Sequence, residues 1–379
     1  MKRKIFIVTE RRADFSRFKP IIKLIKLSKN LDYDLVVTGN HILKEYGNTI
    51  NEIKKENFKI FKTFKMFLKN RENDGSEMVH GLGIAIQELS KIVKKSNPDI
   101  ILSGFDIAAN LAVTIVGAHM NIPVAHIQGG EVSGTIDESI RHAMSKFSHY
   151  HFVSNLDAKI RLIKMGEIKK NIYIVGCPSI DALNQEALLS KEYIKKKFSI
   201  DLDEKYLILI QHPVTSEIRS NEQISNTLKA LGKFNIAKLI IFPNNDAGSK
   251  KIIKVLKNSK FKIVKTLNLR EYKTLLSNAS LLVGNSSSGI HEAATYKLPV
   301  VNIGSRQNGR LKSINVVNAN YSTQDIIKKI KFVLNNLQFK RRIKSIKNPY
   351  GDGNSAKKIV SYLSKVKIDK NIIQKKITY

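Results

Sequence analysis

The chain has 379 residues, more than one ordinary hydrophobic core accommodates, so we expect two domains. Hydrophobic residues make up 42% of it, as in soluble globular proteins, and no apolar run approaches the roughly 20 residues that span a membrane. The formal charge of +33 suggests a nucleic-acid partner, but the lysines are spread along the chain without a basic block. This spread favours a lysine-rich surface, no nucleic-acid or membrane partner, and an anionic small substrate.

The sequence contains a single cysteine, Cys177, which excludes an intrachain disulfide and makes a cytoplasmic setting the default expectation. Residues 1–8 begin with charged side chains and continue with a short apolar run. This run is too short for a signal peptide, so we expect the first strand there.

Short aliphatic runs alternate with amphipathic stretches along the first half of the chain. The expected strands are residues 4–8, 34–37, 100–103, 124–127, 151–153 and 172–175. Helices are expected at residues 17–28 and 110–119. Near-continuous aliphatic strands separated by helices are typical of a parallel sheet that is covered on both faces.

The same pattern starts again after Gly176-Cys177-Pro178. Strands are expected at residues 206–210, 238–242, 261–264, 281–283 and 300–303, and helices at 222–234, 270–278 and 354–366, with residues 367–379 frayed. We therefore predict an α/β protein of two doubly wound domains, residues 1–178 and 179–379. Ligands bind beyond the carboxyl ends of such strands, so the predicted active site lies in a cleft between the domains.

Two carboxylates follow the expected strand at residues 124–127. Gly129 and Gly130 allow a sharp backbone turn there, and Glu131 and Asp137 lie around the expected start of a helix. Carboxylates at strand ends exchange protons with a substrate when burial raises their pKa. The alternative for Asp137 is a purely structural helix cap.

Residues 284–289, Gly-Asn-Ser-Ser-Ser-Gly, follow another expected strand and open the helix that contains Glu292. Small residues and backbone N–H groups at a helix start favour phosphate binding over an ordinary serine-rich loop. This loop differs from a Walker A loop because no Gly-Lys-Ser/Thr follows.

Three further side chains come directly after expected strands: Arg12, His212 and Arg306. Arginines in this position pair with phosphate or stack on a base, and a histidine stabilises a departing phosphate. Solvated arginines and a structural histidine are the alternatives. His149 and His151 would share a strand face, but no third ligand is evident near them, so no metal site is expected.

Together these residues resemble the hydrolysing UDP-N-acetylglucosamine 2-epimerase family. They most resemble its sialic-acid-pathway branch, which includes the epimerase half of the bifunctional epimerase/N-acetylmannosamine kinase. The resemblance extends from Arg-Ala-Asp-Phe-Ser at 12–16 to Tyr-Gly-Asp-Gly-Asn at 350–354, and residues 129–137 and 211–215 carry blocks specific to that branch.

The resemblance implies two Rossmann-like domains of the GT-B glycosyltransferase type, a nucleotide-sugar substrate, no cofactor and a homodimer. It places the catalytic groups on Asp106, Glu131, Asp137 and His212. It places the UDP contacts on Arg12, Ser16, Ser286, Ser287, Glu292 and Arg306.

One departure from the family pattern concerns Ile107. The family usually has Gly-Asp-Arg after the strand that ends near Ser103, whereas this chain has Ser-Gly-Phe-Asp-Ile. Counting back from Asn121-Ile122 puts Asp106 on the family aspartate and Ile107 on its arginine, so one cation is missing. Anchoring on Gly104 instead shifts the aspartate out of register.

The resemblance implies that the enzyme removes the C2 proton of UDP-N-acetylglucosamine while the anomeric C–O bond breaks. UDP leaves, and water adds to 2-acetamidoglucal to give N-acetylmannosamine. The alternatives are the same chemistry on UDP-N,N′-diacetylbacillosamine, a GT-B glycosyltransferase, a nucleic-acid-binding protein, and an inactive sugar-nucleotide sensor.

Overall fold

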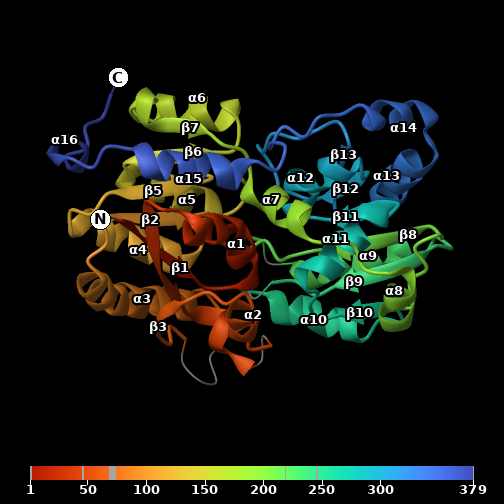
Figure 1. Ribbon diagram of the computed structural model, residues 1–379. Coiled ribbons are helices and arrows are strands. Elements are labelled where there is room, and N and C mark those ends of the chain that lie inside the picture. Colours follow the sequence, from red (N-terminus) through yellow and green to blue (C-terminus); the bar gives the residue numbers. More distant parts are fainter. Residues whose placement is uncertain (1, 45–46, 68–73, 218, 245, 379) are drawn as a thin grey trace. The chain divides into compact units, whose positions relative to one another are not determined.

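The computed structural model describes residues 2–44, 47–67, 74–217, 219–244 and 246–378 (Figure 1). The chain forms two compact units. Unit 1 comprises residues 1–131, 137–182 and 350–379, and unit 2 comprises residues 132–136 and 183–349.

Unit 1 is built on a parallel sheet of seven strands in the order β3-β2-β1-β4-β5-β6-β7. The strands are β1 (Arg3–Thr9), β2 (Leu31–Val37), β3 (Ile60–Thr63), β4 (Ile100–Gly104), β5 (Val124–Ile127), β6 (Tyr150–Val153) and β7 (Ile172–Ile174). The helices are α1 (Arg12–Leu27), α2 (Ile50–Lys55), α3 (Gly75–Ser96), α4 (Ala108–His119), α5 (Asp137–Phe147), α6 (Leu156–Lys164), α7 (Pro178–Gln185), α15 (Ser355–Lys365) and α16 (Lys370–Ile373), with the short 3-10 turns η1 (Gly39–Ile42) and η3 (Lys169–Asn171).

Unit 2 repeats this plan with a parallel sheet of six strands in the order β10-β9-β8-β11-β12-β13. The strands are β8 (Tyr206–Ile210), β9 (Ala237–Ile241), β10 (Lys262–Val264), β11 (Leu281–Gly284), β12 (Val300–Ile303) and β13 (Val316–Ala319). The helices are α8 (Lys191–Phe198), α9 (Ser220–Leu231), α10 (Ser249–Lys257), α11 (Leu269–Asn278), α12 (Ser288–His291), α13 (Thr323–Asn335) and α14 (Leu337–Lys344), with the 3-10 turn η4 (Ala293–Tyr296).

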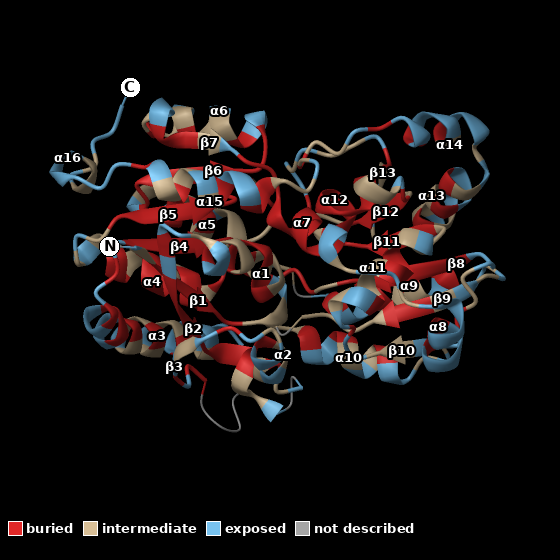
Figure 2. Ribbon diagram, in the orientation of Figure 1, coloured by how far each residue is buried: buried red, intermediate tan, exposed pale blue. Residues whose placement is uncertain are grey.

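Each sheet separates two hydrophobic cores, because successive side chains of a strand point to opposite faces. In β1, Ile5 and Ile7 belong to one core and Phe6 and Val8 to the other. In β8, Leu207 and Leu209 alternate in the same way with the residues between them. The strands β4, β5, β8, β11 and β12 are therefore buried along their length (Figure 2), as the uninterrupted aliphatic runs predict.

Both sheets reverse their strand order at one point, between β1 and β4 in unit 1 and between β8 and β11 in unit 2. At this point the connections leave in opposite directions, and doubly wound sheets bind ligands beyond the strand ends there. The chain after β4 leads to Asp106, and the chain after β8 leads to His212. The predicted fold class, two parallel-sheet Rossmann-like domains, is thus confirmed.

The division of the chain differs from the expected boundary near residue 178. Residues 350–379 belong to unit 1, because α15 contributes Ala356, Ile359 and Leu363 to the same core as Ile5 and Ile7. Residues 132–136 belong to unit 2. The apolar face of α15 was visible in the sequence, but the sequence does not indicate which sheet it covers.

The expectation of a frayed segment after residue 366 is also wrong. Residues 370–373 form α16, and the Lys375 side chain is only 18% exposed. The N–H of Thr378 donates to the carbonyl of Gly166 at 3.0 Å. Specific hydrogen bonds therefore order this stretch, although its composition is polar and lysine-rich. None of the described helices is both long and apolar enough to cross a membrane.

Candidate functional site

The carboxylates singled out in unit 1 surround Arg141, a side chain on α5 that is 2% exposed. Its Nη2 forms an ion pair with the carboxylate of Asp106, and its Nη1 donates to the carbonyl of Glu131 at 2.9 Å. Burial alone would lower the pKa of Arg141, but the charges of Asp106, Glu131 and Asp137 outweigh it and raise that pKa. We call Asp106, Glu131, Asp137 and Arg141 the carboxylate cluster.

Glu131 is held by two neutral donors in addition to its neighbouring cation. Its Oε1 accepts from Nε2 of Gln128 at 2.9 Å and from Oγ of Ser154 at 2.6 Å, and the residue is 4% exposed. Both bonds suit an ionised carboxylate, which only accepts hydrogen bonds. The side chain is therefore fixed in direction.

Asp137 is the first residue of α5, and Arg141 lies one turn further along the same face of the helix. The partial positive charge of a helix N-terminus favours a carboxylate there. The structural interpretation of Asp137 as a helix-start residue is consequently compatible with its place in the cluster.

The turn between β5 and Glu131 depends on both of its glycines. A Cβ on Gly129 would lie 2.8 Å from Nδ1 of His126 and 2.8 Å from Oγ of Ser145. Gly130 has a φ of +76°, and a Cβ there would lie 2.4 Å from the carbonyl oxygen of Ala158. A larger residue at either position would displace Glu131.

His126 connects the two segments that carry the carboxylate cluster. Its Nε2 donates to the carbonyl of Phe105 at 3.3 Å, and its Nδ1 lies 3.2 Å from Oγ of Ser145 on α5. The ring is completely buried, and mainly because of that burial its pKa falls to about 3. His126 is therefore neutral at physiological pH.

This burial makes the stability of the protein depend on pH in a way that His126→Asn tests. The unfolded chain takes up a proton on the histidine near its ordinary pKa of about 6.5, whereas the folded chain does so only near 3. Lowering the pH from 7 to 5 therefore favours the unfolded state by about 2 kcal/mol through this residue. We expect His126→Asn to reduce the loss of unfolding free energy between pH 7 and pH 5 by that amount, as measured by urea titration at both values.

Other groups titrate in the same interval but cancel in this comparison. His41, with a pKa lowered to about 3 mainly by burial, acts in the same direction, and Asp14, with a pKa raised to about 6 by burial, acts in the opposite one. Both are present in wild type and variant alike. His80→Asn, at an exposed position, is the matched control. An equal pH dependence in His126→Asn and wild type would contradict the prediction.

Ile107 is a core residue. It is 5% exposed and packs in the same core as Phe18 and Phe105. An arginine there would place an uncompensated charge in that core. Asp106, the preceding residue, keeps a side chain that is 25% exposed, and Arg141 supplies the cation beside it.

In unit 2, His212 is oriented by backbone and amide contacts. The N–H of Asn244 donates to its Nδ1 at 3.1 Å, so the neutral ring carries its proton on Nε2. The backbone N–H of His212 donates to Oδ1 of Asn285 at 2.7 Å, and Nδ2 of Asn285 donates back to the His212 carbonyl at 2.9 Å. His212 can thus donate a hydrogen bond through Nε2.

Asn285 also holds the loop that contains Arg306. Its carbonyl accepts from Nε2 of Gln307 at 2.8 Å and from Nη1 of Arg306 at 3.4 Å. Nη2 of Arg306 lies 3.8 Å from Oδ2 of Asp246. The preceding Gly284 has a φ of +120°, and a Cβ there would lie 2.0 Å from the carbonyl oxygen of Ile210, so only glycine brings β8 and β11 this close.

In and just after the serine loop, residues 284–289, several backbone N–H groups already have hydrogen-bond acceptors within the loop. The N–H of Ser288 donates to Oγ of Ser286 at 3.3 Å, and the N–H groups of Gly289 and Ile290 donate to the carbonyls of Ser286 and Ser287. The helix that follows, α12, has only four residues. The expectation of phosphate binding therefore rests on Ser286 and Ser287 themselves.

Glu292 follows α12 and is 6% exposed, beside two tyrosines. Burial, and after it the charge of Glu292, raises the pKa of Tyr296 to about 12 and also raises that of Tyr272. The tyrosines therefore stay protonated next to this carboxylate.

Arg12 and Ser16 lie on the first turns of α1 in unit 1. Nε of Arg12 donates to Oε2 of Glu52 at 3.1 Å, and Oγ of Ser16 donates to the carbonyl of Ala13 at 2.9 Å. The side chains of Arg12 and Glu52 are 27% and 40% exposed. Nη2 of Arg12 also donates to Oε1 of Glu52, so the two side chains form a bidentate pair.

The structure brings together three of the predicted residues around Arg141 and two more, His212 and Arg306, around Asn285. Arg141 and Asn285 had no predicted role. The Asp137–Arg141 spacing of four on a helix was a usable signal for the first. Asn285 contacts both His212 and Arg306 only because β8 pairs with β11, and no local sequence pattern shows this pairing.

Within the described ranges no group of three His, Cys, Asp or Glu side chains is arranged to hold a metal ion. Nδ1 of His149 accepts from the N–H of Val124 at 3.0 Å, and Nε2 of His151 lies 3.0 Å from Oε2 of Glu167. Both histidines therefore have structural contacts.

Comparison with known proteins gives consistent matches. The family model of UDP-N-acetylglucosamine 2-epimerase matches residues 23–364. The UDP-N,N′-diacetylbacillosamine 2-epimerase (hydrolyzing) of Legionella pneumophila is 36% identical over 380 residues, covering 99% of each chain. The UDP-N-acetylglucosamine 2-epimerase of Neisseria meningitidis serogroup B is 36% identical over 330 residues, covering 86% of each chain.

Among solved structures, the UDP-GlcNAc 2-epimerase from Neisseria meningitidis bound to UDP-GlcNAc superimposes with a TM-score of 0.83. It is 19% identical and covers 96% of this chain and 100% of its own. At this identity the match establishes a shared fold.

Proposed function

Because the chain belongs to the UDP-N-acetylglucosamine 2-epimerase family, we propose that it is a hydrolysing 2-epimerase of a UDP-linked 2-acetamido sugar. The products would be UDP and the free sugar with inverted configuration at C2. The observation that carries this proposal is the carboxylate cluster, in which the buried Arg141 pairs with Asp106, donates to the backbone carbonyl of Glu131 and is affected by the charges of Glu131 and Asp137.

The carboxylate cluster supplies the groups that remove and return a proton at a sugar carbon. Glu131 is oriented by Gln128 and Ser154 and would act as the base at C2. Asp106 and Asp137 would assist the proton transfers that accompany addition of water. Arg141 keeps all three carboxylates close together without the repulsion that their charges would otherwise cause.

The groups of unit 2 suit the departing diphosphate. His212 presents an Nε2 donor, and Arg306 carries a guanidinium that donates to the backbone carbonyl of Asn285. Donors that are fixed before the reaction stabilise charge that develops on a leaving group. Ser286, Ser287 and Glu292 in unit 2, and Arg12 and Ser16 in unit 1, complete the proposed UDP contacts.

The two candidate sugars differ in their substituents at C4 and C6. The relative that matches over 99% of both chains is named for UDP-N,N′-diacetylbacillosamine, and the one matching over 86% is named for UDP-N-acetylglucosamine. These matches do not single out the sialic-acid branch. We propose UDP-N,N′-diacetylbacillosamine as the first candidate substrate and UDP-N-acetylglucosamine, with N-acetylmannosamine as its product, as the second.

Product analysis by NMR in D2O tests both the chemistry and the sugar. We expect free UDP and a sugar that carries deuterium at C2, because proton abstraction at C2 exchanges that hydrogen with solvent. The preferred substrate would show a higher kcat/KM in parallel assays with the two nucleotide sugars. Release of UDP with the original hydrogen retained at C2 would contradict the proposal and indicate hydrolysis or transfer instead.

The same assay separates two of the alternatives. A GT-B glycosyltransferase would leave C2 intact and require an acceptor, and an inactive sensor would bind UDP without turnover. A nucleic-acid-binding protein would show affinity for duplex or RNA that falls steeply with salt. The homodimer and the cytoplasmic location remain predictions.

A further inference from the structure

The segment after α15 contacts the end of α5 through one lysine. Nζ of Lys375 donates to the carbonyls of Ser145, Lys146 and Ser148 at 2.8, 2.9 and 2.8 Å. It also lies 2.5 Å from Oε2 of Glu167. Because the last carbonyls of a helix have no partners within the helix, a buried ammonium is well suited to bind them.

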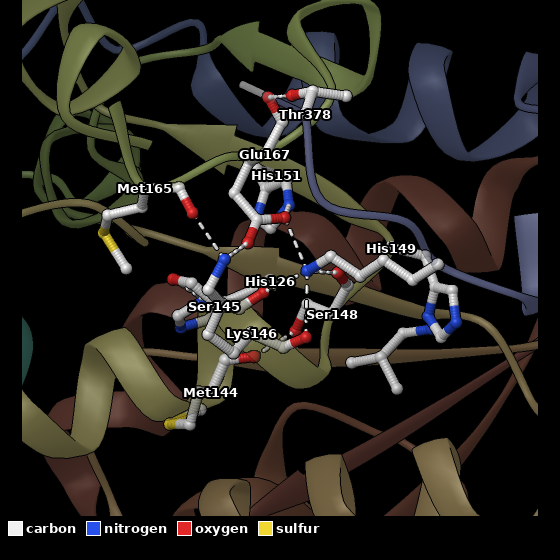
Figure 3. Close-up of polar contacts among 12 residues, drawn as sticks. His126, Met144, Ser145, Lys146, Ser148, His149, His151, Met165, Glu167 and Thr378 are labelled. Atoms are coloured by element: carbon white, nitrogen blue, oxygen red, sulfur yellow. Dashed lines mark hydrogen bonds and ion pairs between the residues drawn. The ribbon is translucent and has the colours of Figure 1, made fainter. Parts of the chain in front are cut away.

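Glu167 fixes this lysine to the body of unit 1. It is 1% exposed, and besides Lys375 it is bound by Nε2 of His151 at 3.0 Å and by Nζ of Lys146 at 3.1 Å. Figure 3 shows Glu167 between His151, which comes from β6, and Lys146, which comes from α5. The carboxylate therefore links the lysine, the sheet and the helix at one point.

The bound end of α5 is one turn from the carboxylate cluster. Oγ of Ser145 donates to the carbonyl of Arg141 at 3.0 Å and lies 3.2 Å from Nδ1 of His126. Lys375 binds the carbonyl of the same serine. Ser145 therefore connects the bound end of α5 to Arg141 and, through His126, to the carbonyl of Phe105.

We propose that Lys375 is a positioning residue for the carboxylate cluster, because it binds the C-terminal end of the helix that begins at Asp137 and carries Arg141. Its ammonium fixes the axial position and rotation of α5. The kinetic test of this inference, by kcat, rests on the proposed function. The structural test, by hydrogen exchange of the α5 amides, is independent of it.

The test compares Lys375→Met with Lys376→Met, a substitution of the exposed neighbouring lysine. We expect Lys375→Met to lower kcat by about tenfold or more, since small displacements of positioned groups cost up to about a hundredfold. The affinity for UDP, measured by calorimetry, should stay within about twofold. Lys376→Met should match wild type in both.

Hydrogen exchange of the α5 amides provides the second readout. In Lys375→Met we expect these amides to exchange about tenfold faster, with the amides of α4 unchanged. Lys375→Arg, which keeps the charge and donors, should recover part of kcat and of the α5 protection. Should Lys375→Met fail to fold, Lys375→Gln replaces it, because it removes the charge and keeps a polar group.

Three results would overturn the inference: an unchanged kcat in Lys375→Met, unchanged exchange in α5, or equal acceleration in α4 and α5, which indicates general loss of stability. If wild-type protein epimerises neither nucleotide sugar, the proposed function fails while the exchange comparison still decides whether Lys375 holds the helix.

Discussion

Arg141→Met should lower kcat by about a thousandfold, the largest effect that we expect from any single substitution. The buried guanidinium is bonded to Asp106 and to the carbonyl of Glu131, and it faces Asp137. Without it, the carboxylates repel one another and take up protons, so the base at C2 is lost together with its orientation. Steady-state kinetics with the preferred nucleotide sugar measures the change.

The same variant should also lose unfolding free energy, by roughly 3–5 kcal/mol, the usual cost of removing one partner from a buried ion pair. Arg141→Lys keeps the charge but not the two-pronged geometry, so its kcat should lie between those of Arg141→Met and wild type. Arg219→Met, at a site whose side chain is 81% exposed, serves as the control. If Arg141→Met folds and retains kcat within tenfold of wild type, the cluster is not the catalytic centre.

The sheet interiors were predictable from the sequence because they are buried on both faces. The runs at Val124–Ile127, Tyr206–Ile210 and Val300–Ile303 coincide with β5, β8 and β12, since a continuous aliphatic stretch fits only such an environment. Two edge strands, β7 and β10, were predicted, whereas the other two, β3 and β13, were not. The two that were missed carry polar residues such as Lys62 and Asn318 among their aliphatic ones.

The candidate site was predictable to the extent that strand ends could be recognised. Asp106, Glu131 and His212 follow runs whose ends were clear, and the structure places them beyond β4, β5 and β8. Contacts that join distant segments were not predictable. The pairing of Lys375 with Glu167 spans 208 positions of the chain between two unremarkable charged residues, and only the packed structure reveals it.

At Ile107 the family motif has an arginine, whereas the structure has a buried core position. The count from Asn121-Ile122 gives the aspartate a plausible register, yet the residue after it is apolar because it turns into the core with Phe18. The cation next to Asp106 comes instead from α5. Counting along the sequence suggests a missing charge, whereas the structure supplies one from another element.

Glu131→Gln should lower kcat by about a hundredfold or more while leaving the fold and the UDP affinity unchanged. The substitution is nearly isosteric, and the amide oxygen can still accept from Gln128 and Ser154, so the turn after β5 should keep its shape. What is lost is the negative charge and the capacity to take a proton, which is worth about a hundred- to ten-thousandfold in acid–base catalysis.

Glu138→Gln, at a neighbouring half-buried carboxylate of α5, removes the same charge outside the cluster and should leave kcat within about twofold of wild type. Kinetics in D2O adds a specific readout, because the residual turnover of Glu131→Gln should show slower deuterium incorporation at C2 in proportion to its kcat. A kcat within a few-fold of wild type would mean that Glu131 only shapes the turn, and the base would then have to be Asp106 or Asp137.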